Sequence, residues 1–241
     1  MQQMSRSYDA VIFDMDGVII DSKELVESFW IENMKKYGIE IPKGDELELR
    51  FHGRPARLTV NDLFADLPES TREEIIEECA RFDASVEKFK MIPGVEPFMK
   101  KCADSGIRLG LVTSALPEKV DRMLAGLSYP SPFDVRITAD LVQNGKPDPE
   151  CYLTAAQGLD VDPGRMIVFE DSISGVKAAS EAGATVIGIN EEHLSGPLLD
   201  AGAMLVIPNF SDAKLIHGEL KVTIYPGSGH RENSFEVKKP G

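Results

Sequence analysis

The chain has 241 residues, 42% of them hydrophobic and 27% charged, a composition typical of a soluble globular protein. Its 26 basic and 40 acidic residues give a net charge of −14, which a nucleic acid backbone would repel, so we expect no nucleic acid partner. No apolar run reaches the roughly 20 residues of a membrane-spanning helix, the N-terminus carries no signal-peptide pattern, and three scattered cysteines suit a reducing compartment, so we expect a cytoplasmic protein with no membrane partner.

Short runs rich in β-branched and aromatic residues recur along the chain, without the alternation of a half-exposed strand. Such runs are typical of strands that are buried on both faces. Helical patterns lie between most of them, so the chain reads as βαβ units and predicts an α/β fold. The fold class is a Rossmann-like, doubly wound parallel sheet with helices on both faces. The predicted strands are Ala10–Phe13, Ile107–Ser114, Arg165–Asp171, Thr185–Asn190 and Met204–Asn209.

One segment interrupts this alternation. Residues 21–90 contain no convincing strand, and apolar residues recur there at helical spacing. Ser70 and Glu73 have the spacing of a capping box and predict a helix start at Ser70. The predicted helical stretches are Lys23–Gly38, Arg54–Leu67 and Ser70–Phe89.

The order of these patterns predicts the domain organisation. Residues 1–20 and 91–217 are expected to form one discontinuous core, and residues 21–90 an all-helical cap inserted into it. Leu220–Tyr225 alternates between apolar and polar residues, so residues 218–241 are expected to add a strand, a flexible tail, or both.

Polar side chains stand where predicted strands end. Asp14 and Asp16 follow the first strand, Thr113 and Ser114 end the second, and Asp171 ends the third. Ligands of parallel sheets bind beyond the carboxyl ends of the strands, so we expect these side chains to face one crevice. The two aspartates of the first strand would repel each other unless a cation joins them, and Mg²⁺ is a cation that prefers such oxygen ligands.

The same residues suit phosphate chemistry. One aspartate can act as a nucleophile that forms an acyl-phosphate, and the other can protonate the leaving group and then activate water. The Thr113 hydroxyl and neighbouring turn amides can bind phosphate oxygens, and Lys146 can offset the phosphate charge. Glu170, beside Asp171, supplies a further carboxylate.

Four motifs occur along the chain in an order that indicates a protein family. "DMDGV" at Asp14–Val18 and "LVTSA" at Leu111–Ala115 each follow a strand, and "GKPDPE" at Gly145–Glu150 precedes "VFEDSISGVKAA" at Val168–Ala179. Together they resemble the haloacid dehalogenase-like (HAD) superfamily of phosphatases. The sequence is most similar to the branch with a helical cap after the first motif, which includes β-phosphoglucomutase and phosphoglycolate phosphatase.

This resemblance implies a role for each matching residue. Asp14 is expected to be the nucleophile and a Mg²⁺ ligand, and Asp16 the general acid/base whose backbone carbonyl binds the metal. Asp171 completes the metal site, with Glu170 either a further ligand or a support for the ligands. The residues expected to hold the transferring phosphoryl group are Thr113, Ser114 and Lys146.

The resemblance predicts a Mg²⁺-dependent phosphatase that hydrolyses a small phosphomonoester, with sugar phosphates among the candidate substrates, through an aspartyl-phosphate intermediate. It leaves two alternatives. One is a sugar phosphomutase, which in that branch carries a cap histidine and a cap arginine where this chain has Val26 and Ala56. The other is a non-catalytic regulator that binds a metabolite or a protein, against which the intact motifs argue. The oligomeric state is left open, with a monomer favoured.

The cap segment contains a cluster of basic side chains beside Gly53. It can serve as a substrate-recognition patch that closes over the crevice, or as ordinary helix-surface charge among acidic neighbours. We keep both interpretations for Arg50, His52, Arg54 and Arg57.

Overall fold

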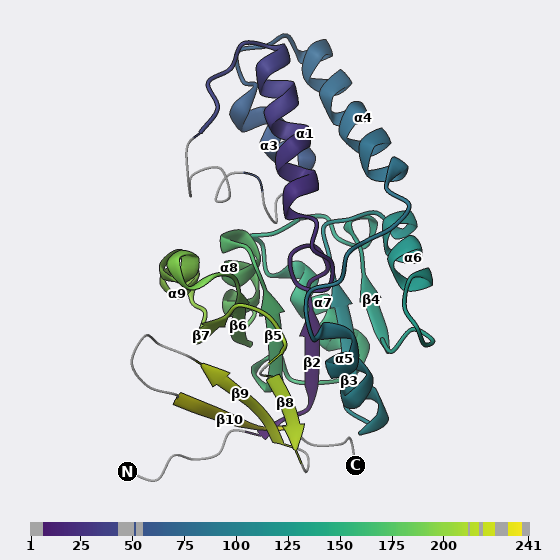
Figure 1. Ribbon diagram of the computed structural model, residues 1–241, viewed down its shortest axis with the longest axis vertical. Helices are drawn as coiled ribbons and strands as arrows, with labels where there is room; N and C mark the ends of the chain where they lie inside the picture. Colours follow the sequence, from purple (N-terminus) through teal and green to yellow (C-terminus); the bar gives the residue numbers. More distant parts are fainter. Residues whose placement is uncertain are drawn as a thin grey trace.

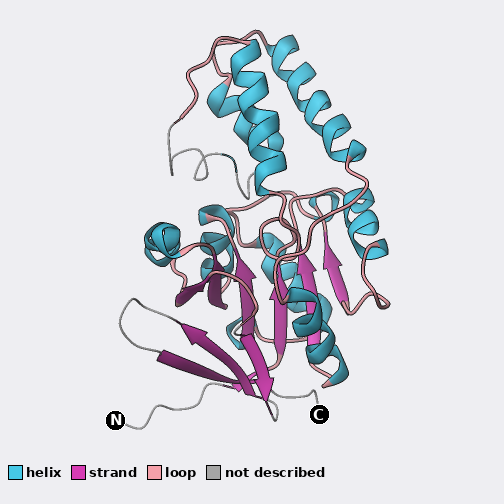
Figure 2. Cartoon of the chain, in the orientation of Figure 1, coloured by secondary structure: helices cyan, strands magenta, loops and turns pink. Residues whose placement is uncertain are grey.

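The computed structural model describes residues 7–42, 51, 55–211, 213–216, 219–224 and 231–237. Its centre is a six-stranded parallel sheet with helices on both faces, so the predicted Rossmann-like α/β fold is confirmed (Figures 1 and 2). None of the described helices is both long and apolar enough to cross a membrane. The strands, in their order across the sheet, are β4 (Val135–Ile137), β3 (Arg108–Val112), β2 (Ala10–Phe13), β5 (Met166–Glu170), β6 (Thr185–Ile189) and β7 (Leu205–Ile207).

Alternate residues of the central strand face opposite layers. Val11 and Phe13 belong to the hydrophobic cluster that includes α5 (Val95–Asp104) and α6 (Pro117–Ala125). Ala10 and Ile12 belong to a second cluster on the other face. All four residues of β2 are buried, which explains why the sequence run is apolar without alternation. The second cluster is covered by α7 (Glu150–Leu159), α8 (Ile173–Glu181) and α9 (Ser195–Ala201).

Four phenylalanines form the centre of the first cluster, directly below the strand ends. The rings of Phe13 and Phe169 stack at a centroid distance of 5.3 Å, and Phe98 meets both of them edge-on. Phe210 closes the group at 4.8 Å from Phe169. Because Phe13 and Phe169 immediately precede Asp14 and Glu170, this packing fixes where those two carboxylates leave the sheet.

A helical lobe lies over the carboxyl ends of the parallel strands, toward which their arrowheads point (Figure 1). Its own buried cluster includes Phe29, Trp30 and Phe64. The two chain connections to the sheet run side by side, with Ile20 bridged to Met91. The lobe contains α1 (Lys23–Lys36), α3 (Ala56–Leu63) and α4 (Glu69–Ser85).

Two local predictions differ from the structure. Helix α4 begins at Glu69 after Pro68, without a side-chain cap, so the predicted capping box at Ser70 and Glu73 is wrong. Proline fixes the backbone angle that leads into the helix, and Glu73 pairs instead with Arg57 of α3. Strand β4 was not indicated by the sequence because it has only three residues.

A second sheet lies at the end of the molecule opposite the helical lobe (Figure 1). The predicted strand at Leu220–Tyr225 corresponds to β9 (Glu219–Ile224). The sequence indicated neither of the strands that pair with β9, nor the parallel pairing of β10 with β1 (Ser7–Tyr8). The two partners of β9 are β8 (Ala213–Ile216) and β10 (Arg231–Val237).

The ring of Phe98 makes the packing testable. Replacing Phe98 with Ala removes its contacts with three other rings and should lower the free energy of unfolding by about 3–5 kcal/mol. The matched control is Leu153→Ala on α7, where the side chain is 44% exposed and the loss should stay within about 0.5 kcal/mol. Urea denaturation measures both, and an equal loss in the two variants would contradict the assigned core.

Candidate active site

The pairing of β2 with β5 builds the centre of the site. The two strands are parallel and in register, with Phe13 opposite Phe169. The amide of Asp14 still donates to the carbonyl of Phe169 at 3.0 Å, so the ladder extends one residue past β2. Asp14 and Glu170 therefore leave the sheet side by side.

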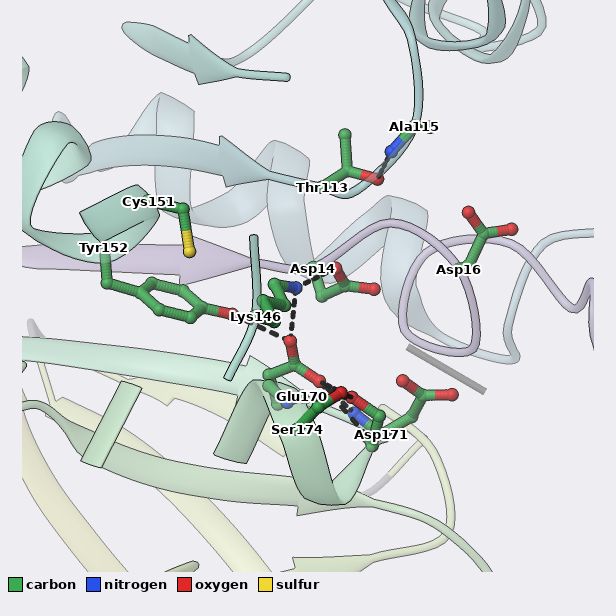
Figure 3. A network of polar contacts seen from close by, with 12 residues as sticks. Asp14, Asp16, Thr113, Ala115, Lys146, Cys151, Tyr152, Glu170, Asp171 and Ser174 are labelled. Carbon is green, nitrogen blue, oxygen red and sulfur yellow. Dashed lines mark hydrogen bonds and ion pairs between the residues drawn. The ribbon is translucent and has the colours of Figure 1, made fainter. Parts of the chain in front are cut away.

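Lys146 reaches both carboxylates from the loop before α7. Its Nζ donates to Asp14 Oδ1 at 2.5 Å and to Glu170 Oε1 at 2.5 Å (Figure 3). All three side chains are buried, with Lys146 only 2% exposed. Burial lowers the pKa of Lys146, but the two carboxylates raise it by more, so it lies well above its usual value and the ammonium stays charged.

Glu170 is fully engaged by hydrogen bonds. Its Oε1 also accepts from the Tyr152 hydroxyl at 2.8 Å. Its Oε2 accepts from the amides of Asp171 and Ser172 at 3.0 and 3.2 Å, and from the Ser172 hydroxyl at 3.0 Å. With five donors on one carboxylate, its lone pairs are occupied. This favours the second of the two roles left open above, in which Glu170 supports Lys146.

The start of α8 explains how Glu170 is held. Ser172 is the N-cap of this helix, and its Oγ accepts from the amide of Gly175 at 3.0 Å. A Cβ at Gly175 would lie 1.8 Å from Glu170 Oε1, so only glycine allows the carboxylate this close to the helix.

Three carboxylates converge beside Lys146. Ligand atoms of Asp14, Glu170 and Asp171 all lie within 4.8 Å of one another. Burial raises the pKa of Asp14 to about 8, against the lowering effect of Lys146. Burial, followed by the charges of Glu170 and Asp14, also raises the pKa of Asp171 well above its usual range.

This donor set fits a divalent cation. Asp171 Oδ1 is buried and accepts no hydrogen bond from the described part of the chain. Three acidic groups share one ammonium, so their ionised forms repel one another unless a hard cation with oxygen ligands joins them. The carboxylates of Asp14 and Asp171 are the groups available to bind it.

The turn after β2 depends on Gly17. Its φ of +74° lies in the left-handed region, and a Cβ there would stand 1.8 Å from Asp171 Oδ2. Glycine therefore lets the loop that carries Asp16 pass directly against the Asp171 carboxylate.

Asp16 faces a different cation from Asp14. Lys119 of α6 donates to Asp16 Oδ1 at 3.0 Å and Oδ2 at 3.2 Å. Figure 3 places the Asp16 carboxylate apart from the Asp14, Lys146 and Glu170 cluster. A lysine therefore holds each of the two carboxylates separately, Lys146 that of Asp14 and Lys119 that of Asp16.

Thr113 and Ser114 lie in the loop that follows β3. Thr113 is buried, and its Oγ1 accepts from the amide of Ala115 at 3.1 Å, which fixes the turn and leaves the hydroxyl proton to donate (Figure 3). Both residues line the same cavity as Asp14 and Asp16.

The cavity has a volume of about 490 Å³ and lies between the strand ends and the helical lobe. The sheet side supplies aspartates, hydroxyls and Lys119, and the lobe supplies largely apolar side chains. Val26 and Ala56, the positions compared above with the mutase cap residues, both line it. The apolar lining from the lobe also includes Trp30, Phe51 and Ile76.

Of the basic cluster predicted in the cap, only Arg57 lies within the described residues. Arg57 forms an exposed ion pair with Glu73 and is not among the residues that line the cavity. This placement agrees with the helix-surface interpretation for Arg57. The predictions for Arg50, His52 and Arg54 fall outside the described residues.

Three functional side chains were not identified from the sequence. Tyr152 and Ser172 hold Glu170, and Lys119 holds Asp16. Ser172 carried a usable signal, because it directly follows the predicted strand end at Asp171 and opens a helix. Tyr152 and Lys119 look like ordinary helix residues in the sequence.

A family model described as haloacid dehalogenase-like hydrolase matches residues 11–189. This chain belongs to the haloacid dehalogenase-like hydrolases. The family predicted from the four motifs, and the prediction of an enzyme of that family, are therefore confirmed.

Relatives of this hydrolase include named phosphatases. Validoxylamine A 7′-phosphate phosphatase of Streptomyces hygroscopicus subsp. limoneus is 32% identical over 200 residues, covering 82% of this chain and 93% of the relative. Phosphorylated carbohydrates phosphatase of Thermotoga maritima is 35% identical over 206 residues, covering 83% and 94%. A β-phosphoglucomutase from Clostridium difficile shares the fold, with a TM-score of 0.71 at 23% identity over 86% of this chain and 94% of that one.

Gly17 provides a test of the site geometry. Gly38 has a similar φ of +68° but no atom near its missing Cβ, so Gly38→Ala should cost only the backbone strain, about 1–2 kcal/mol. Gly17→Ala should cost distinctly more, because its Cβ also displaces the Asp171 carboxylate. Urea denaturation of both variants without metal gives the comparison, and equal losses would contradict the close approach of Gly17 to Asp171.

Proposed function

We propose that this hydrolase is a Mg²⁺-dependent phosphatase that removes phosphate from a small phosphorylated sugar through an aspartyl-phosphate on Asp14. The observation that carries the proposal is the buried Lys146 held between Asp14 and Glu170, beside an Asp171 oxygen that has no hydrogen-bond partner among the described residues. This arrangement can receive a phosphate dianion next to a carboxylate nucleophile, which would otherwise repel it.

Two displacements make up the reaction. In the first, an Asp14 carboxylate oxygen attacks phosphorus, the bond from phosphorus to the leaving oxygen breaks, and the Asp16 carboxyl gives that oxygen a proton. In the second, the Asp16 carboxylate takes a proton from water, whose oxygen attacks phosphorus and releases Asp14. Asp16 thus donates and regains one proton per turnover.

The remaining groups bind the phosphoryl oxygens. The Thr113 hydroxyl and the Ser114 loop border the cavity beside Asp14. The Lys146 ammonium holds Asp14 Oδ1, which leaves Oδ2 to attack, and offsets charge as nucleophile and phosphate approach. Glu170 keeps Lys146 in this position.

Asp14, Asp171 and the backbone carbonyl of Asp16 are the groups we propose for binding Mg²⁺. When bound there, the ion supplies positive charge to the phosphate and to the Asp14 carboxylate. We do not propose Glu170 as a metal ligand, because its carboxylate already accepts five hydrogen bonds. Its proposed role is to hold Lys146 in place.

The described residues on the lobe side of the cavity favour hydrolysis over mutase activity. A phosphomutase must bind a second phosphate group of a sugar bisphosphate while the sugar reorients in the site. This requires cationic groups opposite Asp14. Val26 and Ala56 stand at the two positions compared with mutase residues, and neither side chain can bind phosphate.

A phosphorylated sugar is the substrate class that fits best. One of the two phosphatase relatives described above is named for phosphorylated carbohydrates and the other for validoxylamine A 7′-phosphate, and each matches most of this chain. A cavity of about 490 Å³ admits a sugar-sized leaving group.

Turnover of p-nitrophenyl phosphate tests the reaction. Activity should be lost with EDTA and return with Mg²⁺, and Asp14→Asn should be inactive because an amide cannot act as the nucleophile. The matched control is Asp121→Asn on α6, whose exposed carboxylate pairs only with Arg136 in the described contacts and whose loss should leave turnover unchanged. Metal-independent turnover, or an active Asp14→Asn, would contradict the proposal.

Metal binding can be measured without turnover. Mg²⁺ at about 100 times its dissociation constant should raise the free energy of unfolding of the wild type by about 2.7 kcal/mol. Asp171→Asn should lose most of this gain, because it removes one of the two carboxylates proposed to bind the ion. Thermal denaturation with and without Mg²⁺ gives the result, and an unchanged gain in the variant would exclude Asp171 as a ligand.

The fate of the phosphate separates a hydrolase from a mutase. With a hexose 1-phosphate and a trace of the matching bisphosphate, phosphorus NMR should show only inorganic phosphate accumulating. Formation of a hexose 6-phosphate would instead establish phosphoryl return to the sugar and would refute hydrolysis as the main activity.

A further inference from the structure

Lys119 is a buried cation at the cavity that the mechanism above does not use. It stands in the first turn of α6, only 7% exposed, and lines the cavity together with Asp16. Its ammonium contacts both oxygens of Asp16, so the plane of that carboxylate is held from one side. Burial lowers the pKa of Lys119, and Asp16 and Asp83 raise it by more, so the ammonium stays charged.

The same ammonium contacts the helical lobe. Lys119 Nζ donates to Asp83 Oδ1 at 3.2 Å, near the end of α4. One turn further along α6, Arg122 Nη2 donates to the backbone carbonyl of Asp83 at 2.8 Å. The end of α4 is therefore attached to α6 through its side chain and its backbone.

We propose that Lys119 is the positioning residue for Asp16: it aims the Asp16 carboxyl at the leaving-group oxygen when the helical lobe lies over the cavity. This inference rests on the proposed function, in which Asp16 is the acid and base. It adds a residue outside the four motifs and gives the contact between the lobe and α6 a chemical role.

The geometry supports this because Asp16 has no other cation among its described contacts. It lies on the loop after β2, and its side chain is 26% exposed toward the cavity. Without Lys119 the carboxyl could rotate freely about its side-chain bonds, and proton transfer needs hydrogen-bond distance and direction at the leaving oxygen. Asp83 also accepts a hydrogen bond from this ammonium, so the lobe restricts Lys119 in turn.

Leaving-group dependence separates positioning of Asp16 from simple support of the lobe. Benzyl phosphate and p-nitrophenyl phosphate are similar in size, but only the benzyl alkoxide needs a proton to leave. Lys119→Met should lower kcat/KM for benzyl phosphate by about 10²-fold and leave p-nitrophenyl phosphate much less affected. Lys119→Arg, which keeps a charged donor, should restore most of the loss.

Two further variants provide the comparison. Asp83→Asn removes the charge pair with the lobe while leaving the pair between Lys119 and Asp16, so it should lower kcat/KM less than Lys119→Met does, and more for benzyl phosphate than for p-nitrophenyl phosphate. Lys100→Met removes an exposed lysine that pairs with Asp104 on α5, and it should change kcat/KM for neither substrate. If Lys119→Met lowers kcat/KM for both substrates equally, Lys119 only attaches the lobe and the inference is wrong.

Asp16→Asn distinguishes failure of this inference from failure of the proposed function. It should show the same selective loss with benzyl phosphate. If Asp16→Asn is selective and Lys119→Met is not, only the role of Lys119 is refuted. If Asp16→Asn lowers kcat/KM for both substrates equally, the acid role of Asp16 is refuted, and the inference on Lys119 is refuted with it.

Discussion

The shared ammonium of Lys146 is the interaction on which the rest of the site depends. A buried carboxylate without a partner costs several kcal/mol, and one lysine gives both Asp14 and Glu170 the partner charge that offsets this cost. Tyr152 and Ser172 then saturate the remaining lone pairs of Glu170. The result is a cluster whose geometry is fixed but whose charge is not balanced, as a site for a cation and a phosphate requires.

Much of this site could be predicted from the sequence because strand ends can be read from it. An apolar run that stops at Asp14 or at Asp171 marks the carboxyl end of a strand, and parallel strands bring these ends together. Lys146 lies in a loop and was found through its motif. Tyr152 and Lys119 were missed because each acts through contacts with distant parts of the chain, which helical spacing does not reveal.

The errors in the predicted fold have the same physical origin, because they also depend on contacts between distant parts of the chain. The capping box was predicted from spacing alone. In the structure Pro68 precedes the first residue of α4, and Glu73 forms an ion pair with Arg57 of α3. Strand β4 is too short for a pattern, and it forms because β3 offers an edge to pair with. The pairing of β10 with β1 joins the two ends of the chain, a contact that no local pattern indicates.

The motif contains two aspartates whose chemistry is set by what surrounds them. Asp14 is 4% exposed and pinned by Lys146, so one oxygen is held while the other faces the cavity, as a nucleophile needs. Asp16 pairs with Lys119, and it lines the cavity to which the helical lobe also contributes side chains. Residues two apart in the sequence thus belong to two different environments, one rigid and belonging to the sheet, the other completed only where α4 meets α6. In the proposed mechanism, that division assigns bond formation to the sheet and places proton transfer where the lobe can influence it.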